Sequence, residues 1–332
     1  MIRYNRIPSS FLLKLLGEGA LNFLTEVLIC KNRVKLDVQF REKDTISIYC
    51  GSTEIADIRV RSNYIDISAA HAYSKQSCAK GVIKRWKTGE YSAQSLKDAI
   101  LKYFDRVEVN SRYWSKEGYT QVKWEQRCGR NWNPEMPFMV FDREVVLGYN
   151  SDVQKKELQE KFISSVDLAR KSIENIPDKK WAKCKNRNSN ELDLIALGND
   201  GKSIVLIEVK HHSAISGEIY YSPLQILYYV LEWENALKSQ DAGDLIRGIN
   251  NLVKAKKRLR LLPIDAPELK DGIKPDLKPI IAVDEAGWSK EVNYRLREVI
   301  KTTNSVTHNA LGKLQIWEYP KDQEPLEYHL DI

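Results

Sequence analysis

The stretch from residue 191 to residue 211 constrains the fold more than any other part of the chain. Two segments with strand character, residues 191–197 and 203–211, flank the sequence Gly-Asn-Asp-Gly at residues 198–201. Asn, Asp and Gly tolerate positive φ angles, so these four residues favour a tight turn between antiparallel strands. The pattern predicts a β-hairpin, and its register decides which polar side chains meet.

Two registers of this hairpin are compatible with the sequence. If residues 199 and 200 form the centre of the turn, Asp193 lies opposite Leu206; if the centre lies one residue later, Asp193 lies opposite Glu208. In both registers Asp193 shares a face of the sheet with Glu208 and Lys210, because side chains alternate along a strand. Asp193 and Glu208 are then direct or diagonal neighbours, roughly 5–8 Å apart.

The second strand of the hairpin places charges at a costly position. Residues 204–207 are all apolar, which predicts a strand covered on both faces. Glu208 and Lys210 at its end cost several kcal/mol unless they are paired or bind an ion. Two carboxylates, Asp193 and Glu208, attract a hard cation such as Mg²⁺, which acidifies a bound water and neutralises phosphate charge. An ordinary cross-strand ion pair with Lys210 is the alternative.

These residues resemble the motif of the PD-(D/E)XK nuclease superfamily. Asp193 is followed after fourteen residues by Glu208, Val209 and Lys210, while Leu192 replaces the proline of the family motif. The resemblance implies a restriction-endonuclease-like fold and a Mg²⁺ or Mn²⁺ ion. It also implies that Asp193, Glu208 and the backbone carbonyl of Val209 bind the metal, and that Lys210 is the catalytic lysine.

A second resemblance concerns the helix that follows the hairpin. Gln225 and Tyr229 form the Q-x-x-x-Y pattern of the RecB-like branch of the same superfamily, and residues four apart share a helix face. Both residues also have a structural interpretation. Residues 222–225 read Ser-Pro-Leu-Gln, a capping box in which Gln225 caps the helix, and Tyr229 also fits a half-buried core position.

The superfamily tends to carry one more acidic residue on the helix before the sheet. Glu157 and Glu160 are the candidates, and the periodicity of the helix does not decide between them. We favour Glu157.

The length of 332 residues fits two domains. We expect a β-rich α+β domain over residues 1–148, with a recognition or regulatory role. We expect an α/β nuclease domain over residues 149–332, with a mixed sheet flanked by helices.

The first domain is expected to begin with a helix over residues 1–30 and to continue as an antiparallel meander. Its expected strands are residues 34–40, 45–50, 54–60 and 64–68, and a helix is expected at residues 91–104. In the second domain we expect helices at residues 151–176, 223–237, 245–261 and 290–301. The expected strands are residues 181–186, 191–197, 203–211, 279–284 and 314–319.

The net charge of +7 suits a polyanionic partner. The helix over residues 245–261 carries Arg247, Lys254, Lys257 and Arg258, which either grip a nucleic-acid backbone or form a plain solvated face. Four aromatic residues among cations in the first domain either stack bases or form a core, and we favour the core. They are Trp114, Tyr119, Trp124 and Trp132.

The five cysteines include no pair with C-x-x-C spacing, which argues against a zinc ribbon or a disulfide framework and favours reduced thiols in a cytoplasmic protein. No apolar run is long enough to cross a membrane, and the apolar patch near the N-terminus reads as an amphipathic helix rather than a signal peptide.

The sequence therefore predicts a cytoplasmic, Mg²⁺-dependent deoxyribonuclease. An RNase, a ligand-activated nuclease and a non-catalytic nucleic-acid-binding or scaffolding module stay open as alternatives, as does a homodimer. We expect Asp193→Ala and Lys210→Ala to abolish cleavage and to leave thermal stability nearly intact.

Overall fold

The computed structural model describes residues 2–4, 6–31, 35–109, 117–177, 181, 191–211, 216–284, 289–319 and 325–328. The chain divides into two compact units. Unit 1 comprises Met1–Tyr4, Trp124–Arg247 and Pro267–Ile332, and unit 2 comprises Asn5–Lys123 and Gly248–Ala266. Each unit is described by itself.

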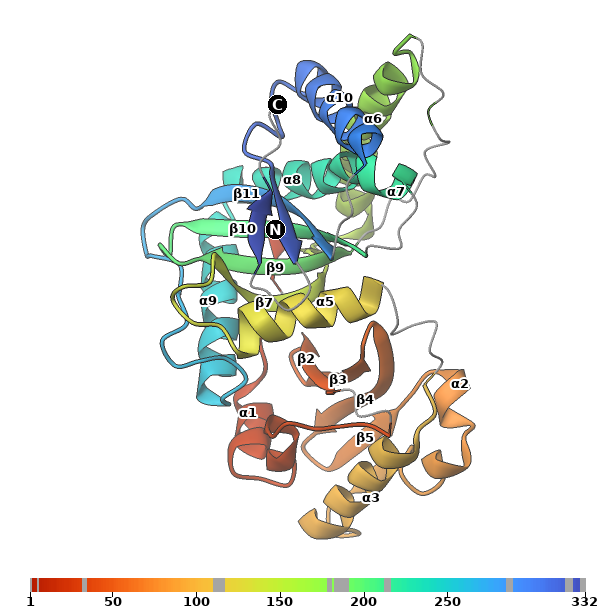
Figure 1. The fold of residues 1–332 in the computed structure, drawn as a ribbon. Coiled ribbons are helices and arrows are strands. Elements are labelled where there is room, and N and C mark those ends of the chain that lie inside the picture. The colour runs from red at the N-terminus through yellow and green to blue at the C-terminus, as the bar shows by residue number, and fades with distance from the viewer. Residues whose placement is uncertain are drawn as a thin grey trace. The chain divides into compact units, whose positions relative to one another are not determined.

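Unit 1 is built on a six-stranded mixed sheet (Figure 1). Its strands, in spatial order, are β13 (Leu326–Tyr328), β12 (Gln315–Tyr319), β11 (Asp276–Asp284), β10 (Ser203–Lys210), β9 (Leu192–Gly198) and β7 (Phe138–Val145). β11 runs parallel to both β10 and β12, and the other neighbouring pairs are antiparallel. The expected mixed α/β architecture is therefore confirmed for this part of the chain.

Helices form two further layers of unit 1 (Figure 1). The long apolar helix α8 (Ser222–Lys238) packs on β10 and β11, and α6 (Asp152–Glu174) and α10 (Lys290–Val306) pack on α8. All eight residues of β10 are buried, as its apolar run predicts. The shorter elements are β1 (Ile2–Arg3), which pairs with β8 (Gly148–Tyr149), the π-helix η3 (Gln126–Arg130) and α7 (Ser216–Tyr220).

Unit 2 contains the antiparallel meander that the sequence predicts, with a fifth strand, β6, that was not predicted. Its strands are β2 (Asp37–Glu42), β3 (Thr45–Cys50), β4 (Thr53–Arg61), β5 (Tyr64–Ser68) and β6 (Arg85–Lys87). The helical elements are α1 (Ser10–Gly17), η1 (Asn22–Thr25), α2 (His71–Ser74), η2 (Ser77–Ala79) and α3 (Ala93–Arg106). The hydroxyl of Tyr103 on α3 donates a hydrogen bond of 2.7 Å to the carbonyl of Ile55 on β4.

Two further helices cross the division between the units. They are α5 (Glu117–Glu125) and α9 (Ala242–Arg258).

The expected single helix over residues 1–30 is wrong. Ser9 caps α1, which ends at Gly17 after eight residues, and a short 3-10 helix follows. The chain turns back closely at Gly19, where an added Cβ would lie 2.7 Å from the Cα of Leu15. Two glycines within three residues weaken the helix, since glycine costs about 1 kcal/mol relative to alanine in a helix interior.

The division between the units also differs from the boundary expected near residue 148. The chain leaves unit 2 between Lys123 and Trp124, and β7 belongs to the large sheet because it pairs with β9. Pairing between strands distant in sequence leaves no local signal. Most of the expected strand at residues 181–186 lies outside the described residues. Within the described part of the chain, no helix is long and apolar enough to cross a membrane.

Candidate functional site

The β9–β10 hairpin adopts the second of the two expected registers. Ile207 lies opposite Leu194, and continuing this register by one residue places Asp193 opposite Glu208. Partners that face each other across an antiparallel pair project to the same face, with Cβ atoms about 4.5–5.5 Å apart. The structure therefore brings the two predicted acidic residues together at the end of the hairpin away from its turn.

The turn reaches this register through a connection of four residues, 199–202. The N–H of Gly201 donates a hydrogen bond of 2.9 Å to the carbonyl of Gly198, so residues 199 and 200 are central in the turn. These central residues predict the register with Asp193 opposite Leu206, but the strands pair in the register with Asp193 opposite Glu208. Gly201 has a φ of +65°, and an added Cβ would lie 2.6 Å from the carbonyl oxygen of Glu268. Glycine is required here by both backbone conformation and space.

Glu208 and Lys210 form a buried ion pair. The Nζ of Lys210 donates a hydrogen bond of 2.7 Å to Oε1 of Glu208, and the two residues are 5% and 4% exposed. The pairing satisfies the requirement that charges at the end of a covered strand be neutralised. This ion pair joins neighbours along β10, whereas the structural alternative anticipated a pair across the hairpin.

Asp193 lies against the backbone between the two charged residues of β10. Its Oδ2 accepts a hydrogen bond of 2.7 Å from the N–H of Val209. Asp193 is half-buried. The three residues of the predicted motif thus gather at one end of the hairpin, where Asp193 also caps the ladder of backbone hydrogen bonds.

The donor set of this site suits a hard cation with few protein ligands. Two carboxylates and a backbone carbonyl are oxygen ligands of the kind that Mg²⁺ takes, because Mg²⁺ keeps several waters and binds one or two carboxylates. The described residues contain no group of three or more His, Cys, Asp or Glu side chains placed to hold a metal ion. Asp193, Glu208 and Val209 therefore fit a partly hydrated ion rather than a cage formed by protein alone.

Helix α8 holds one strand of the hairpin through Tyr229. The hydroxyl of this buried tyrosine donates a hydrogen bond of 2.5 Å to the carbonyl of Glu191, two residues before Asp193. Tyr229 is therefore both a core residue and a link between α8 and the start of β9. Gln225 is half-buried one helical turn earlier, on the same face of α8.

The capping interpretation of Gln225 is wrong. The N-cap of α8 is Tyr221, without a side-chain cap, and Ser222 is already a helical residue. The hydroxyl of Ser222 donates a hydrogen bond of 2.5 Å backwards to the carbonyl of Ile219. No capping box therefore forms at this end of α8, and Gln225 is not engaged in one.

The predicted acidic residue of the preceding helix lies on the solvent side of α6. Glu157 and Glu160 are both exposed, and Glu160 pairs with Lys156 at 4.0 Å. The buried stripe of α6 includes Phe162 and Val166. Glu157 is about 140° around the helix from Phe162, because each residue advances about 100°. Neither glutamate is on the packed face, and the role of Glu157 stays a prediction.

Another acidic residue, Glu232 on α8, is buried instead. It is 5% exposed and accepts a short hydrogen bond from the hydroxyl of Tyr149. Burial raises the pKa of Glu232 to about 7, while the hydrogen bond from Tyr149 and the charge of Lys155 act in the opposite direction. A glutamate inside a helix has no local signature of burial, so sequence reasoning missed Glu232.

A third acidic residue lies beside Asp193 in the sheet. Arg143 of β7 pairs with Leu194, and Val145 pairs with Leu192. Glu144, which lies between them, is therefore opposite Asp193. Glu144 has a φ of +48°, which is uncommon for a residue other than glycine. Glu144, Asp193 and Glu208 thus occupy one line across three neighbouring strands. Sequence reasoning missed Glu144 because α6 separates β7 from β9 along the chain.

The cations of α9 do not form one uniform solvated face. Arg247 pairs with Asp244 through a short contact, and Lys257 is half-buried and donates a hydrogen bond of 2.9 Å to the carbonyl of Ala266. Lys254 and Arg258 are exposed. The predicted inward residues are confirmed as buried; they are Leu245, Ile249, Leu252 and Val253. The proposed contact with a nucleic-acid backbone stays a prediction for these four cations.

The aromatic residues expected in the first domain separate into two groups. Trp124 and Trp132 are buried, and Trp124 stacks on Phe138 with a centroid distance of 6.1 Å. Both tryptophans are buried as expected, but they belong to unit 1, so they are not part of the core of the β-rich first domain in which they were expected. Tyr119 is half exposed, and Trp114 lies outside the described residues.

No family profile, no curated protein and no solved structure matches the chain.

Proposed function

We propose that the chain is a metal-dependent nuclease of the restriction-endonuclease-like fold that hydrolyses phosphodiester bonds in DNA. One observation carries the proposal: Asp193 and Glu208 face each other in register, with Lys210 hydrogen-bonded to Glu208 at the same end of the hairpin. Glu208 and Lys210 are buried at the end of a strand, where apolar residues would be more stable if the charges had no function. Lys210 is buried with Glu208 rather than extended into solvent.

In the proposed site, Asp193, Glu208 and the carbonyl of Val209 hold Mg²⁺ or Mn²⁺. Bound there, the ion would acidify a water molecule and neutralise charge on the phosphate. A carboxylate has two oxygens with several acceptor sites, so Glu208 is able to keep its hydrogen bond to Lys210 while binding a cation. The ordered carboxylate of Asp193, fixed by the N–H of Val209, reduces the reorganisation that binding requires.

Lys210 provides the charge that assists the reaction. Its ammonium group has three donors, of which one is directed at Glu208. In the proposed reaction another donor orients the attacking water or stabilises the negative charge that develops on the phosphate. Tyr229 maintains the position of β9 relative to α8, and Gln225 is proposed to contact the substrate on the same helix face. Glu157 is the proposed further acidic residue of the site from the preceding helix.

The nucleic-acid partner is proposed from charge alone. Arg247, Lys254, Lys257 and Arg258 supply cations for phosphate contacts, and such contacts make affinity strongly dependent on salt. DNA is favoured over RNA by the resemblance to the nuclease superfamily.

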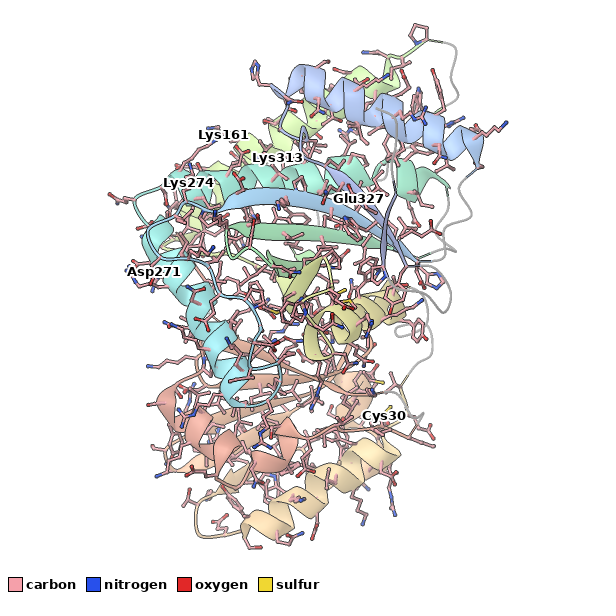
Figure 2. All side chains as sticks on the ribbon, turned by 60° about the vertical axis from the view of Figure 1, so that its left-hand side comes forward. Cys30, Lys161, Asp271, Lys274, Lys313 and Glu327 are labelled. Carbon is pink, nitrogen blue, oxygen red and sulfur yellow. The ribbon has the colours of Figure 1, made fainter. Side chains whose placement is uncertain are left out.

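The test is a cleavage panel with single-stranded, double-stranded and branched DNA and RNA, each with Mg²⁺ and with Mn²⁺. The informative variant is Asp193→Asn, because asparagine keeps an oxygen that accepts the hydrogen bond from Val209 but removes the charge. Its matched control is Asp271→Asn. Asp271 and Lys274 lie in the segment before β11 (Figure 2), and both are exposed.

We expect Asp193→Asn to lose at least about 100-fold of the metal-dependent rate, and Asp271→Asn to cleave like the parent. Equal cleavage by the parent and Asp193→Asn would overturn the proposed site. If the parent cleaves no substrate and a titration detects no bound divalent ion, the site is a binding or scaffolding module. Cleavage of RNA alone would instead identify an RNase.

A further inference from the structure

A pair of thiols in unit 2 has no part in the proposed nuclease reaction. Cys30 and Cys50 are reduced cysteines whose Sγ atoms are 3.5 Å apart. Both are buried, at 4% and 0% exposure. A disulfide has a sulfur–sulfur distance of about 2.05 Å, so the two atoms need to approach by only about 1.5 Å. We propose that Cys30 and Cys50 form a redox-sensitive pair that oxidises to an intramolecular disulfide.

Cys30 belongs to a segment at the surface of the unit. Leu28 and Cys30 are buried, whereas the alternate residues Val27 and Ile29 are 51% and 55% exposed. The segment is not part of the sheet; an isolated bridge between Ile29 and Lys35 holds it, together with a hydrogen bond of 2.9 Å from the N–H of Leu36 to the carbonyl of Leu28. Local opening requires few contacts to break in such a segment. Cys30 is therefore the thiol that a small oxidant reaches first.

Cys50 is held in the sheet. It is the last residue of β3 and pairs with Thr53 across the tight connection to β4. The connection passes through Gly51, which has a φ of +63°. One thiol is thus fixed by a ladder of hydrogen bonds while the other is on a segment that is able to adjust. This combination accommodates the small approach that a disulfide requires.

The reaction balances with a low-molecular-weight disulfide, such as oxidised glutathione, as the oxidant. The thiolate of Cys30 attacks one glutathione sulfur, forms a mixed disulfide and expels the first glutathione thiolate. The thiolate of Cys50 then attacks the sulfur of Cys30 and expels the second. Two protein thiols lose two electrons and two protons, and one oxidised glutathione becomes two reduced molecules. The contact between the protein sulfurs favours the second step over accumulation of the adduct.

The other described cysteines lack this arrangement. Cys78 lies on η2, and its Sγ donates to Oε1 of Gln76 at 3.8 Å. Cys128 is buried in η3, in the other unit. These two residues serve as internal comparisons, and Cys184 lies outside the described residues.

The experiment uses the full chain, first reduced and desalted, then incubated with oxidised glutathione under native conditions. The parent is compared with Cys30→Ala, with Cys50→Ala, and with a triple variant in which Cys78, Cys128 and Cys184 are alanine. Thiols are then blocked in denaturant, and intact mass and peptide mapping locate any bond. A second sample of the triple variant, oxidised in denaturant, shows that its two thiols are chemically able to react.

We expect the parent and the triple variant to lose about 2 Da within one chain, to yield a linked peptide containing Cys30 and Cys50, and to regain both thiols with dithiothreitol. The oxidised triple variant should melt on the order of 5 °C higher than its reduced form, because the bond closes a loop between residues 20 apart. Each single variant should lose this linked peptide. The proposal is overturned if the native triple variant keeps both thiols, stops at a glutathione adduct or links two chains. If that variant does not fold, the linked peptide in the parent decides the outcome.

Discussion

Replacement of Lys210 by methionine tests whether the charges at the end of β10 are bound to each other as tightly as their geometry implies. Methionine keeps the unbranched shape of the side chain, is one atom shorter and removes its charge. The substitution leaves Glu208, which is 4% exposed, without the ammonium group that lies 2.7 Å from its Oε1. Breaking one side of a buried ion pair costs about 3–5 kcal/mol, because the remaining charge is neither solvated nor paired.

The double substitution Glu208→Gln with Lys210→Met separates this cost from lost packing. It removes both charges while approximately keeping the volume of the two side chains. Buried ion pairs replaced as a pair are often neutral in stability, so the double variant should lie within about 1–2 kcal/mol of the parent. The cycle should therefore show a coupling of at least about 2 kcal/mol between the two positions.

The assay is urea unfolding at neutral pH, followed by tryptophan fluorescence and circular dichroism. Lys274→Met at an exposed position is the control, and it should stay within about 0.5 kcal/mol of the parent. If Lys210→Met costs less than about 1 kcal/mol, or if the double variant costs as much as the two single variants together, the charges are not held as described.

Three further predictions concern other positions. The folded-state pKa of Glu232 is about 7, above the ordinary 4.5. Glu232 therefore contributes to the free energy of unfolding below pH 4.5, and this contribution is lost as pH rises through 7. Glu232→Gln should abolish this fall in stability with rising pH. The rise of this pKa from 4.5 to about 7 corresponds to about 3 kcal/mol of unfolding free energy. If the stabilities of the parent and the variant change in parallel between pH 5 and 8, the prediction is wrong. Glu144→Gly should stabilise by about 1 kcal/mol by relieving its φ of +48°, whereas Glu144→Ala should give no such gain in a thermal melt. Gly201→Ala should destabilise by more than about 1 kcal/mol because of its positive φ and its close neighbour. Gly17→Ala, with no atom within 4 Å of the added Cβ, should melt at or slightly above the parent, because alanine favours the helix. Equal melting of the two alanine variants would count against the argument.

Local patterns predicted the elements that carry the site. β3 and β5 have the expected bounds, and β9, β10, α8 and α10 lie within a few residues of theirs apart from a longer C-terminal end of α10. Alternation, apolar runs and helical periodicity are properties of neighbouring residues, so a sequence shows them directly. The same holds for the shared face of Asp193, Glu208 and Lys210, since alternation requires it in either register.

Features that depend on contacts between residues far apart in the sequence could not be predicted from local patterns. β7 joins β9 across the whole of α6, which moves the division between the units and brings Glu144 beside Asp193. Burial of the ion pair also changes an expectation: Lys210→Ala was expected to leave stability nearly intact, but it removes one partner of a buried pair. The outward position of Glu157 depends on which face of α6 packs, and periodicity alone did not fix that.

The connectivity of the two units has a consequence for how the chain can be divided. The polypeptide passes between them three times within its length after Asn5, at residues 123/124, 247/248 and 266/267. A fragment containing only residues 149–332 would omit β7 and expose the edge of β9, and an unpaired strand edge promotes aggregation. The same fragment would retain residues 248–266 without the rest of their unit. Neither unit is therefore encoded by one continuous stretch of gene, and exchange of either one by a single recombination event would disrupt both.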